Sequence, residues 1–235
     1  MSSNMHHRGL DEERFADKLE RFIHKRQIII WAVLIVVLGA IVTYFIWTER
    51  NKKLTEDSAV LAEESQDLYF QWLSEKDEKK KESLEDKLIE KLNNIIRAYP
   101  HQYGGQRALF VRGNFYYSKE KWDKAAADFI DLAKSFAHSY LAEISLYNAG
   151  TCYEELDKNE KAIKIYEELI TKYKESPLYA RTLFAMGRIY EVEKDYSKAS
   201  KYYNKLEDDK PSSNWTKMAR NRMIYLKVNN KIKEE

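Results

Sequence analysis

The sequence predicts an all-α protein with a single N-terminal transmembrane helix, a solenoid of helix-turn-helix repeats and a C-terminal capping helix. Three observations lead to this prediction: residues that recur at a fixed step, a long uncharged run near the N-terminus, and a last apolar helical face. A fixed period of this length is typical of stacked two-helix units, which bury a continuous core only by packing on one another.

The fixed step is 37 residues, because Gly113, Gly150 and Gly187 are equally spaced (150 − 113 and 187 − 150). Leu146, Gly150 and Tyr153 share one helical face, at offsets of four and seven. Glycine inside a helix costs about 1 kcal/mol relative to alanine, so its recurrence indicates close backbone approach. The other sets that keep this phase are Leu109, Leu146 and Leu183; Tyr116, Tyr153 and Tyr190; Ala125, Ala162 and Ala199; Phe129, Tyr166 and Tyr203; and Leu132, Leu169 and Leu206.

This pattern resembles the tetratricopeptide repeat family, whose usual repeat length is 34 residues. The family's small residue, tyrosine, alanine and aromatic residue match Gly150, Tyr153, Ala162 and Tyr166, and its final proline matches Pro211. The resemblance covers residues 106–212 and implies three repeats with a longer turn between units. It also implies a purely structural packing role for Gly113, Tyr116, Ala125, Gly150, Tyr153, Ala162, Gly187, Tyr190 and Ala199.

The flanking segments, 48–105 and 213–235, are expected to carry the two ends of the solenoid. A helix over 50–74, with Leu54, Leu61 and Leu68 at heptad spacing, either rises as a stalk or packs on the first repeat. Lys76 and Lys79 occupy the glycine and tyrosine positions, so residues 69–105 are interpreted as a degenerate repeat with a loop at 75–83 and one intact helix at 84–98. The capping helix is expected over 213–229, with an apolar face of Trp215, Met218, Ala219, Met223 and Leu226.

The membrane anchor is predicted over residues 28–47, which contain no charged side chain. Twenty helical residues span about 30 Å, the thickness of a bilayer core. Trp31, Tyr44 and Trp47 lie near its ends, where interfacial aromatic residues are enriched. The run is too long for a signal peptide and lacks a small-residue cleavage site, so we expect an uncleaved anchor.

Basic residues predict the orientation of this anchor, because cytoplasmic flanks are enriched in lysine and arginine. Six of them precede the span in residues 1–27, and Arg50, Lys52 and Lys53 follow it. We therefore expect a cytoplasmic N-terminus and, in a bacterium, repeats in the periplasm on the inner membrane. An apolar face of the N-terminal segment either contacts lipid or a partner, or belongs to a plain basic flank; its residues are Phe15, Leu19, Phe22 and Ile23.

Composition argues against several functions. The 40 basic and 38 acidic residues are mixed along the repeats, whereas nucleic-acid binding requires a basic face. No metal-ligand spacing, nucleophile motif or phosphate-binding loop occurs, so we expect neither a cofactor nor an enzyme. The lone Cys152 is interpreted as a small packing residue, with a thiol that pairs with another chain as the alternative.

The resemblance places the partner site in a groove lined by the first helix of each unit. Phe110, Tyr147 and Phe184 form an aromatic row there, which suits an apolar or amphipathic peptide or helix. The alternative is that these rings cover a neighbouring helix such as 50–74. The twelve predicted groove residues are Arg107, Phe110, Asn114, Tyr117, Ile144, Tyr147, Thr151, Glu154, Arg181, Phe184, Arg188 and Glu191.

One anchor followed by a repeat domain of this size is similar to the YfgM-like family of ancillary subunits of the Sec translocon. That resemblance implies an adaptor in protein export, in contact with translocon subunits, periplasmic chaperones or secretory proteins. A scaffold for envelope, outer-membrane or cell-wall assembly is the alternative, and an organelle receptor with cytosolic repeats is a third. The oligomeric state and the identity of the partner stay open.

Overall fold

The computed structural model describes residues 3–232, with side chains described from residue 25 onward. Within this range the chain forms nine α-helices and no strand, which confirms the all-α prediction. Their bounds are α1 Ser3–Ser74, α2 Glu78–Ala98, α3 Tyr103–Ser118, α4 Trp122–Ser135, α5 Tyr140–Glu155, α6 Asn159–Lys172, α7 Tyr179–Val192, α8 Tyr196–Asp209 and α9 Asn214–Val228.

The chain divides into two units, residues 1–54 and 55–235. The first unit belongs to α1, whose apolar stretch is long enough to cross a membrane and is not buried against any other part of the chain. Ile28 is 83% exposed, as expected of a side chain that meets lipid instead of protein. The predicted amphipathic face at Phe15, Leu19, Phe22 and Ile23 lies outside the described side chains.

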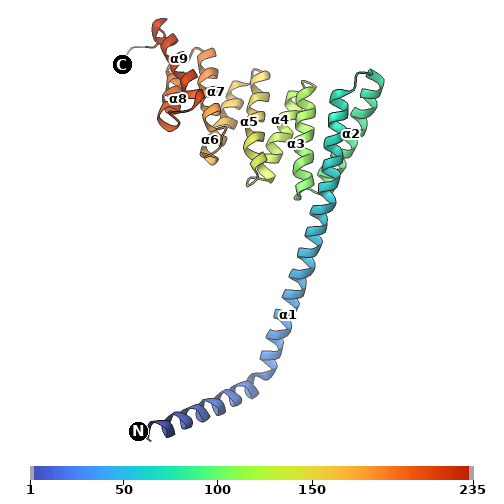
Figure 1. Cartoon of the computed structure of the whole chain (residues 1–235), viewed down its shortest axis with the longest axis vertical. Coiled ribbons are helices and arrows are strands. Elements are labelled where there is room, and N and C mark those ends of the chain that lie inside the picture. Colours follow the sequence, from blue (N-terminus) through green and yellow to red (C-terminus); the bar gives the residue numbers. More distant parts are fainter. Residues whose placement is uncertain (1–2, 233–235) are drawn as a thin grey trace. The chain divides into compact units, whose positions relative to one another are not determined.

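The second unit is a stack of helices in chain order from α3 to α9, each packed against the next (Figure 1). The first helices α3, α5 and α7 alternate with the second helices α4, α6 and α8. A ring from each second helix rests directly on the phased glycine of its partner. A Cβ atom added to Gly150 would lie 2.2 Å from Tyr166, and one added to Gly187 would lie 2.4 Å from Tyr203.

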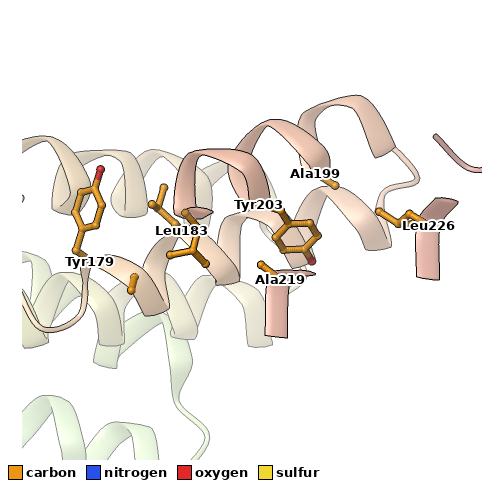
Figure 2. Close-up of a cluster of buried hydrophobic side chains, with 8 residues drawn as sticks. Tyr179, Leu183, Ala199, Tyr203, Ala219 and Leu226 are labelled. Carbon is orange, nitrogen blue, oxygen red and sulfur yellow. The ribbon is translucent and has the colours of Figure 1, made fainter. Parts of the chain in front are cut away.

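Figure 2 shows the buried cluster around Tyr203, which includes Leu183, Ala199 and Ala219. A tyrosine or phenylalanine ring buries far more apolar area than the small residues around it, so it contributes most to the packing of each unit. Glycine and alanine are needed opposite the ring because any larger side chain would occupy the same space.

The turns inside the units repeat as regularly as the core. Glu120, Asp157 and Lys194, again 37 residues apart, have φ values of 55°, 54° and 63°. The following amide donates to the carbonyl five residues back, from Lys158 to Tyr153 at 2.9 Å for example. This is the Schellman arrangement that closes a helix C-terminus, and it is built here without glycine.

Residues 55–74 pack on α2 and α3, and most of them precede the predicted 69–105 unit; this decides between the two sequence alternatives for the segment. The hydroxyl of Ser58 accepts a 3.1 Å hydrogen bond from the amide of Gly104 on α3. Trp72 lies 37 residues before Leu109 and is buried with Leu88 and Leu92 of α2. Leu61 and Leu68 pack against the same cluster, so the heptad is used within the chain.

The predicted loop at 75–83 is wrong in extent, because α2 begins at Glu78. The side chain of Asp77 accepts a 2.9 Å hydrogen bond from the amide of Lys80 and so caps the helix. Lysine and glutamate are good helix formers, and the charged run therefore continues the helix once this cap has started it.

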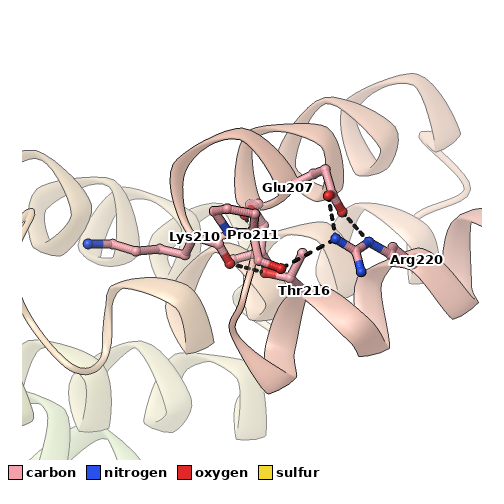
Figure 3. A network of polar contacts seen from close by, with 6 residues as sticks. Glu207, Lys210, Pro211, Thr216 and Arg220 are labelled. Carbon is pink, nitrogen blue, oxygen red and sulfur yellow. Dashed lines mark hydrogen bonds and ion pairs between the residues drawn. The ribbon is translucent and has the colours of Figure 1, made fainter.

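The last helix, α9, lies within one residue of the predicted 213–229 at each end. Its predicted apolar face is partly wrong: Ala219 and Leu226 are buried, but Met218 is 46% exposed. Arg220 occupies the repeat position that Leu183 has 37 residues earlier. Figure 3 shows its guanidinium paired with Glu207, with a further 3.3 Å hydrogen bond to the carbonyl of Pro211. A charged pair thus occupies a position on α9 where the preceding unit has a buried leucine.

Candidate functional site

The twelve predicted groove residues lie on α3, α5 and α7, and every one of their side chains is exposed or half-buried. We call this set the groove face. The neighbouring Leu109, Leu146 and Leu183 are buried, so the face is distinct from the core of each unit. This follows from helical geometry, since positions three and four residues apart share one side of a helix.

The aromatic row of the groove face rests on the buried rings of the second helices. Ring centroids lie 6.0 Å apart for Phe110 and Phe129, 5.6 Å for Tyr147 and Tyr166, and 5.7 Å for Phe184 and Tyr203. Each row residue is therefore half-buried and held in place by its own unit.

Residues 55–74 leave this row open among the described side chains. Leu61, Leu68, Tyr69 and Trp72 join the cluster of α2 and α3, and none of the three row residues belongs to it. The segment reaches the groove face at Gln66, which accepts a hydrogen bond from Arg107. The alternative in which 50–74 covers the row does not hold for this part of the chain.

The carboxylates of the groove face are held by the chain itself. Tyr166 donates a 2.6 Å hydrogen bond to Glu154, which also pairs with Arg188 of the next first helix. Burial and the neighbouring Glu154 raise the pKa of the Tyr166 hydroxyl, so it acts as a permanent donor. The same arrangement recurs 37 residues later, where Glu191 accepts from Tyr203 at 3.1 Å and pairs with Arg222.

A pocket of about 280 Å³ lies between α5 and α7 on this face. It brings together Tyr147, Thr151, Glu154, Arg181 and Arg188 from the predicted set, and the set's other members line no part of it. The remaining lining residues are Glu155, Asp157, Asn159, Ile189 and Val192.

Arg181 forms the most distinctive contact of the groove face. Its guanidinium carbon lies 4.5 Å from the ring centroid of Tyr147 and 5.6 Å from that of Trp215. Cation–π contacts of this kind hold a guanidinium in place while its N–H donors stay free. Trp215 was expected in the apolar face of the last helix; the structure places its ring against the groove face, 5.5 Å from the ring of Phe184 between centroids.

The other groove residues have local roles. Tyr117 packs edge-on against Trp122 with centroids 4.7 Å apart, and Ile144 packs against the cluster of Leu109, Leu132 and Leu141. The backbone carbonyl of Asn114 accepts a 3.0 Å hydrogen bond from Ser118.

The lone thiol is not a site for pairing with another chain. Cys152 is fully buried in α5, and burial raises its pKa to about 12. Its packing with Ala125, Ala126 and Ala149 agrees with the first interpretation, and the intermolecular alternative is wrong for the folded chain. Among the described residues no cluster of three histidine, cysteine, aspartate or glutamate side chains could hold a metal ion.

Comparison with known proteins bears on the repeats. The tetratricopeptide repeat family model matches residues 141–209, which run from the start of α5 to the end of α8. A search of curated proteins found no significant match to the chain. The matched segment contains Gly150, Tyr166, Gly187 and Tyr203, the residues that make the closest contacts between first and second helices. The family match and the helical-repeat architecture together support placing the repeat domain in the tetratricopeptide repeat superfamily.

Proposed function

We propose that this protein is a single-pass, membrane-anchored adaptor that holds protein partners on its groove face. The observation that carries the proposal is the open row of Phe110, Tyr147 and Phe184 beside a pocket lined by Arg181. Half-buried rings fixed by a rigid scaffold lose little entropy when a partner covers them, which is the property expected of an interaction surface. An exposed apolar helix ahead of the repeats supplies the anchor.

The compartment we propose is the periplasm, with the anchor in a bacterial inner membrane. The excess of lysine and arginine before the span supports this orientation. A protease-protection assay on intact and permeabilised cells tests it: the repeats should be digested only after the outer membrane is opened. Protection until the inner membrane is lysed would place the repeats in the cytosol instead.

Within that compartment we propose a role ancillary to the Sec translocon and to periplasmic chaperones. The support is the layout of one short basic segment, one span and one repeat domain, together with a groove face suited to chains that are not yet folded. Envelope or cell-wall assembly machinery is the competing class of partner.

Photo-crosslinking in cells from position Tyr147 distinguishes these partners, because this residue lines the pocket and lies in the centre of the row. Translocon subunits or secretory chains in transit, identified by mass spectrometry, would support the export role. Assembly proteins would replace it with the scaffold role. A matched probe at Lys201, an exposed position on α8 outside the groove face, shows which crosslinks belong to the groove.

A further inference from the structure

The groove face extends beyond the three regular repeats at its C-terminal end. Stepping by 37 residues from Arg107 gives one row of Arg107, Ile144, Arg181 and Met218. The last member comes from α9, whose Trp215 contacts both Arg181 and Phe184 of α7. The capping helix therefore continues the same side as the groove, although it has lost part of the core pattern.

A second row runs beside the first at an offset of three residues: Phe110, Tyr147, Phe184 and Asn221. A third, four residues earlier than the first, comprises Tyr103, Tyr140, Pro177 and Asn214. Side chains at offsets of three and four lie on one side of a helix, so these rows form a single surface near the starts of α3, α5, α7 and α9. All twelve positions are exposed or half-buried.

This surface carries positive charge and no carboxylate. The chain has 38 acidic residues in 235, so twelve positions would carry about two of them at that frequency. The three rows contain none, whereas they contain Arg107 and Arg181. The chain as a whole mixes acidic and basic residues, but the acidic ones are absent from this surface. The difference follows only from the stacking of the first helices.

Three carboxylates line the same pocket as Arg181, those of Glu154, Glu155 and Asp157, but none of them pairs with it. Glu154 is engaged by Tyr166 and Arg188 instead. Among the side chains from residue 25 to 232, no carboxylate forms an ion pair with Arg181, which rests between the rings of Tyr147 and Trp215. A guanidinium fixed in this way presents its N–H fork to an incoming anion without further ordering.

We propose that this surface binds an extended peptide segment in which acidic side chains alternate with apolar ones, with one carboxylate seated on Arg181. The proposal rests on the adaptor function proposed above and specifies its ligand. A carboxylate accepts paired hydrogen bonds from a guanidinium, which makes this the matching anionic group in a protein partner. The flanking apolar side chains cover the rings of Tyr147 and Phe184.

The positions of the two arginines predict the spacing of the acidic residues. Arg107 is on α3 and Arg181 on α7, two first-helix steps apart, and neighbouring packed helices lie about 8–10 Å apart. The separation is therefore about 16–20 Å, and an extended chain advances about 3.3 Å per residue. A second carboxylate five or six residues from the first reaches Arg107, whereas a helical ligand would need about 11–13 residues.

The test uses the full chain in detergent micelles and fluorescent 14-residue probe peptides, with binding followed by anisotropy. One probe carries two glutamates six residues apart among leucine, valine and threonine; a second has glutamine at both positions; a third has its glutamates eleven residues apart. We expect the first probe to bind at least tenfold more tightly than the second, and the advantage to shrink as salt is added.

Arg181→Gln should remove most of that tenfold preference, so that the glutamate and glutamine probes bind it with similar affinity. Arg97→Gln is the matched control, since it removes the same charge from an exposed site on α2 and should alter neither value. Equal binding of the glutamate and glutamine probes, or an unchanged preference in Arg181→Gln, overturns the carboxylate assignment. Tighter binding of the eleven-residue spacing overturns the extended conformation.

Failure of this inference can be separated from failure of the adaptor function. If both probes bind equally and Tyr147→Ala weakens both, the groove binds protein segments but does not select acidic ones. If no probe binds, the ligand assignment is wrong, and the crosslinks from Tyr147 then decide the adaptor function independently.

Discussion

The hydroxyl of Tyr166 donates a 2.6 Å hydrogen bond to the carboxylate of Glu154, twelve residues earlier on the preceding helix. Tyr203 and Glu191 repeat this relationship one step later. In the first regular repeat the corresponding residues are Phe129 and Tyr117, so the hydroxyl and its acceptor are absent together. The carboxylate position on the groove face is therefore coupled to the residue type in the core.

Replacing Tyr166 with phenylalanine should destabilise the repeats by about 1.5–3 kcal/mol, the range for a hydrogen bond to a charged group. The loss should be smaller in a Glu154→Gln background, which a double-mutant cycle by urea unfolding would reveal. The converse change, Phe129→Tyr, should also destabilise, because Tyr117 offers no carboxylate there. A gain in stability from Phe129→Tyr would contradict the coupling.

Gly150→Ala should destabilise by about 1–3 kcal/mol through overpacking, since the added Cβ would lie 2.2 Å from the ring of Tyr166. The midpoint of thermal unfolding is the measurement. The double variant Gly150→Ala, Tyr166→Leu should lose less stability than the sum of the losses in the two single variants. Strict additivity would mean that the ring moves aside freely.

Lys194→Gly should stabilise the repeats by about 1 kcal/mol, because residue 194 has a φ of 63° that side chains with a Cβ disfavour. Glu193→Gly is the control one residue earlier, where φ is −72° and glycine should destabilise. Chemical denaturation of both variants checks the assignment. A destabilised Lys194→Gly would show that the lysine side chain contributes more than its backbone strain costs.

Asp128→Ala should cost about 3–5 kcal/mol, the range for removing one partner of a buried ion pair. The carboxylate is almost fully buried and accepts two hydrogen bonds from Arg112, at 2.8 and 2.6 Å, while Asn93 accepts a third from the same guanidinium. Asp131→Ala, an exposed change on the same helix, should cost far less. Comparable losses in the two variants would show that the pair contributes nothing beyond an ordinary surface residue.

Cys152 should resist maleimide labelling at neutral pH until the repeats unfold. Burial raises the pKa of its thiol from 9.0 to about 12, so the folded state holds the proton that the unfolded state releases. The unfolded state is therefore favoured as the pH rises above about 9, and the group's contribution to stability falls over that range. Rapid labelling of the folded chain would mean that α5 opens locally.

The regular part of the fold could be predicted because glycine recurs at one phase of the repeat, although the close approach there is to an aromatic ring and not to a second backbone as expected. Gly113, Gly150 and Gly187 each lie against a ring of the following helix, and this requirement is visible in sequence. The turns were not predicted, since Glu120, Asp157 and Lys194 adopt a positive φ without the glycine or asparagine that usually signals it. These turns share a hydrogen bond from the following amide to the carbonyl five residues back. This bond joins backbone atoms only, so it does not require a particular residue type.

The groove could be predicted in position but not in chemistry. Its residues follow from helical spacing, yet the state of each charge depends on partners up to 41 residues away, as between Arg107 and Gln66. The sequence shows Arg181, Arg188 and Glu154 as similar surface charges. Only the packed helices distinguish Arg188, which is tied to Glu154, from Arg181, which is held on aromatic rings.

The bidentate pair between Arg220 and Glu207 also affects how copies of this chain could join. A stack of like units invites another copy to continue it, since the internal junctions bury apolar side chains. A newcomer that packed on α9 over Arg220 would have to take this guanidinium out of water, at a position that Leu183 fills in the preceding unit. This position of α9 therefore opposes end-to-end growth, even when anchoring in a membrane crowds many copies together.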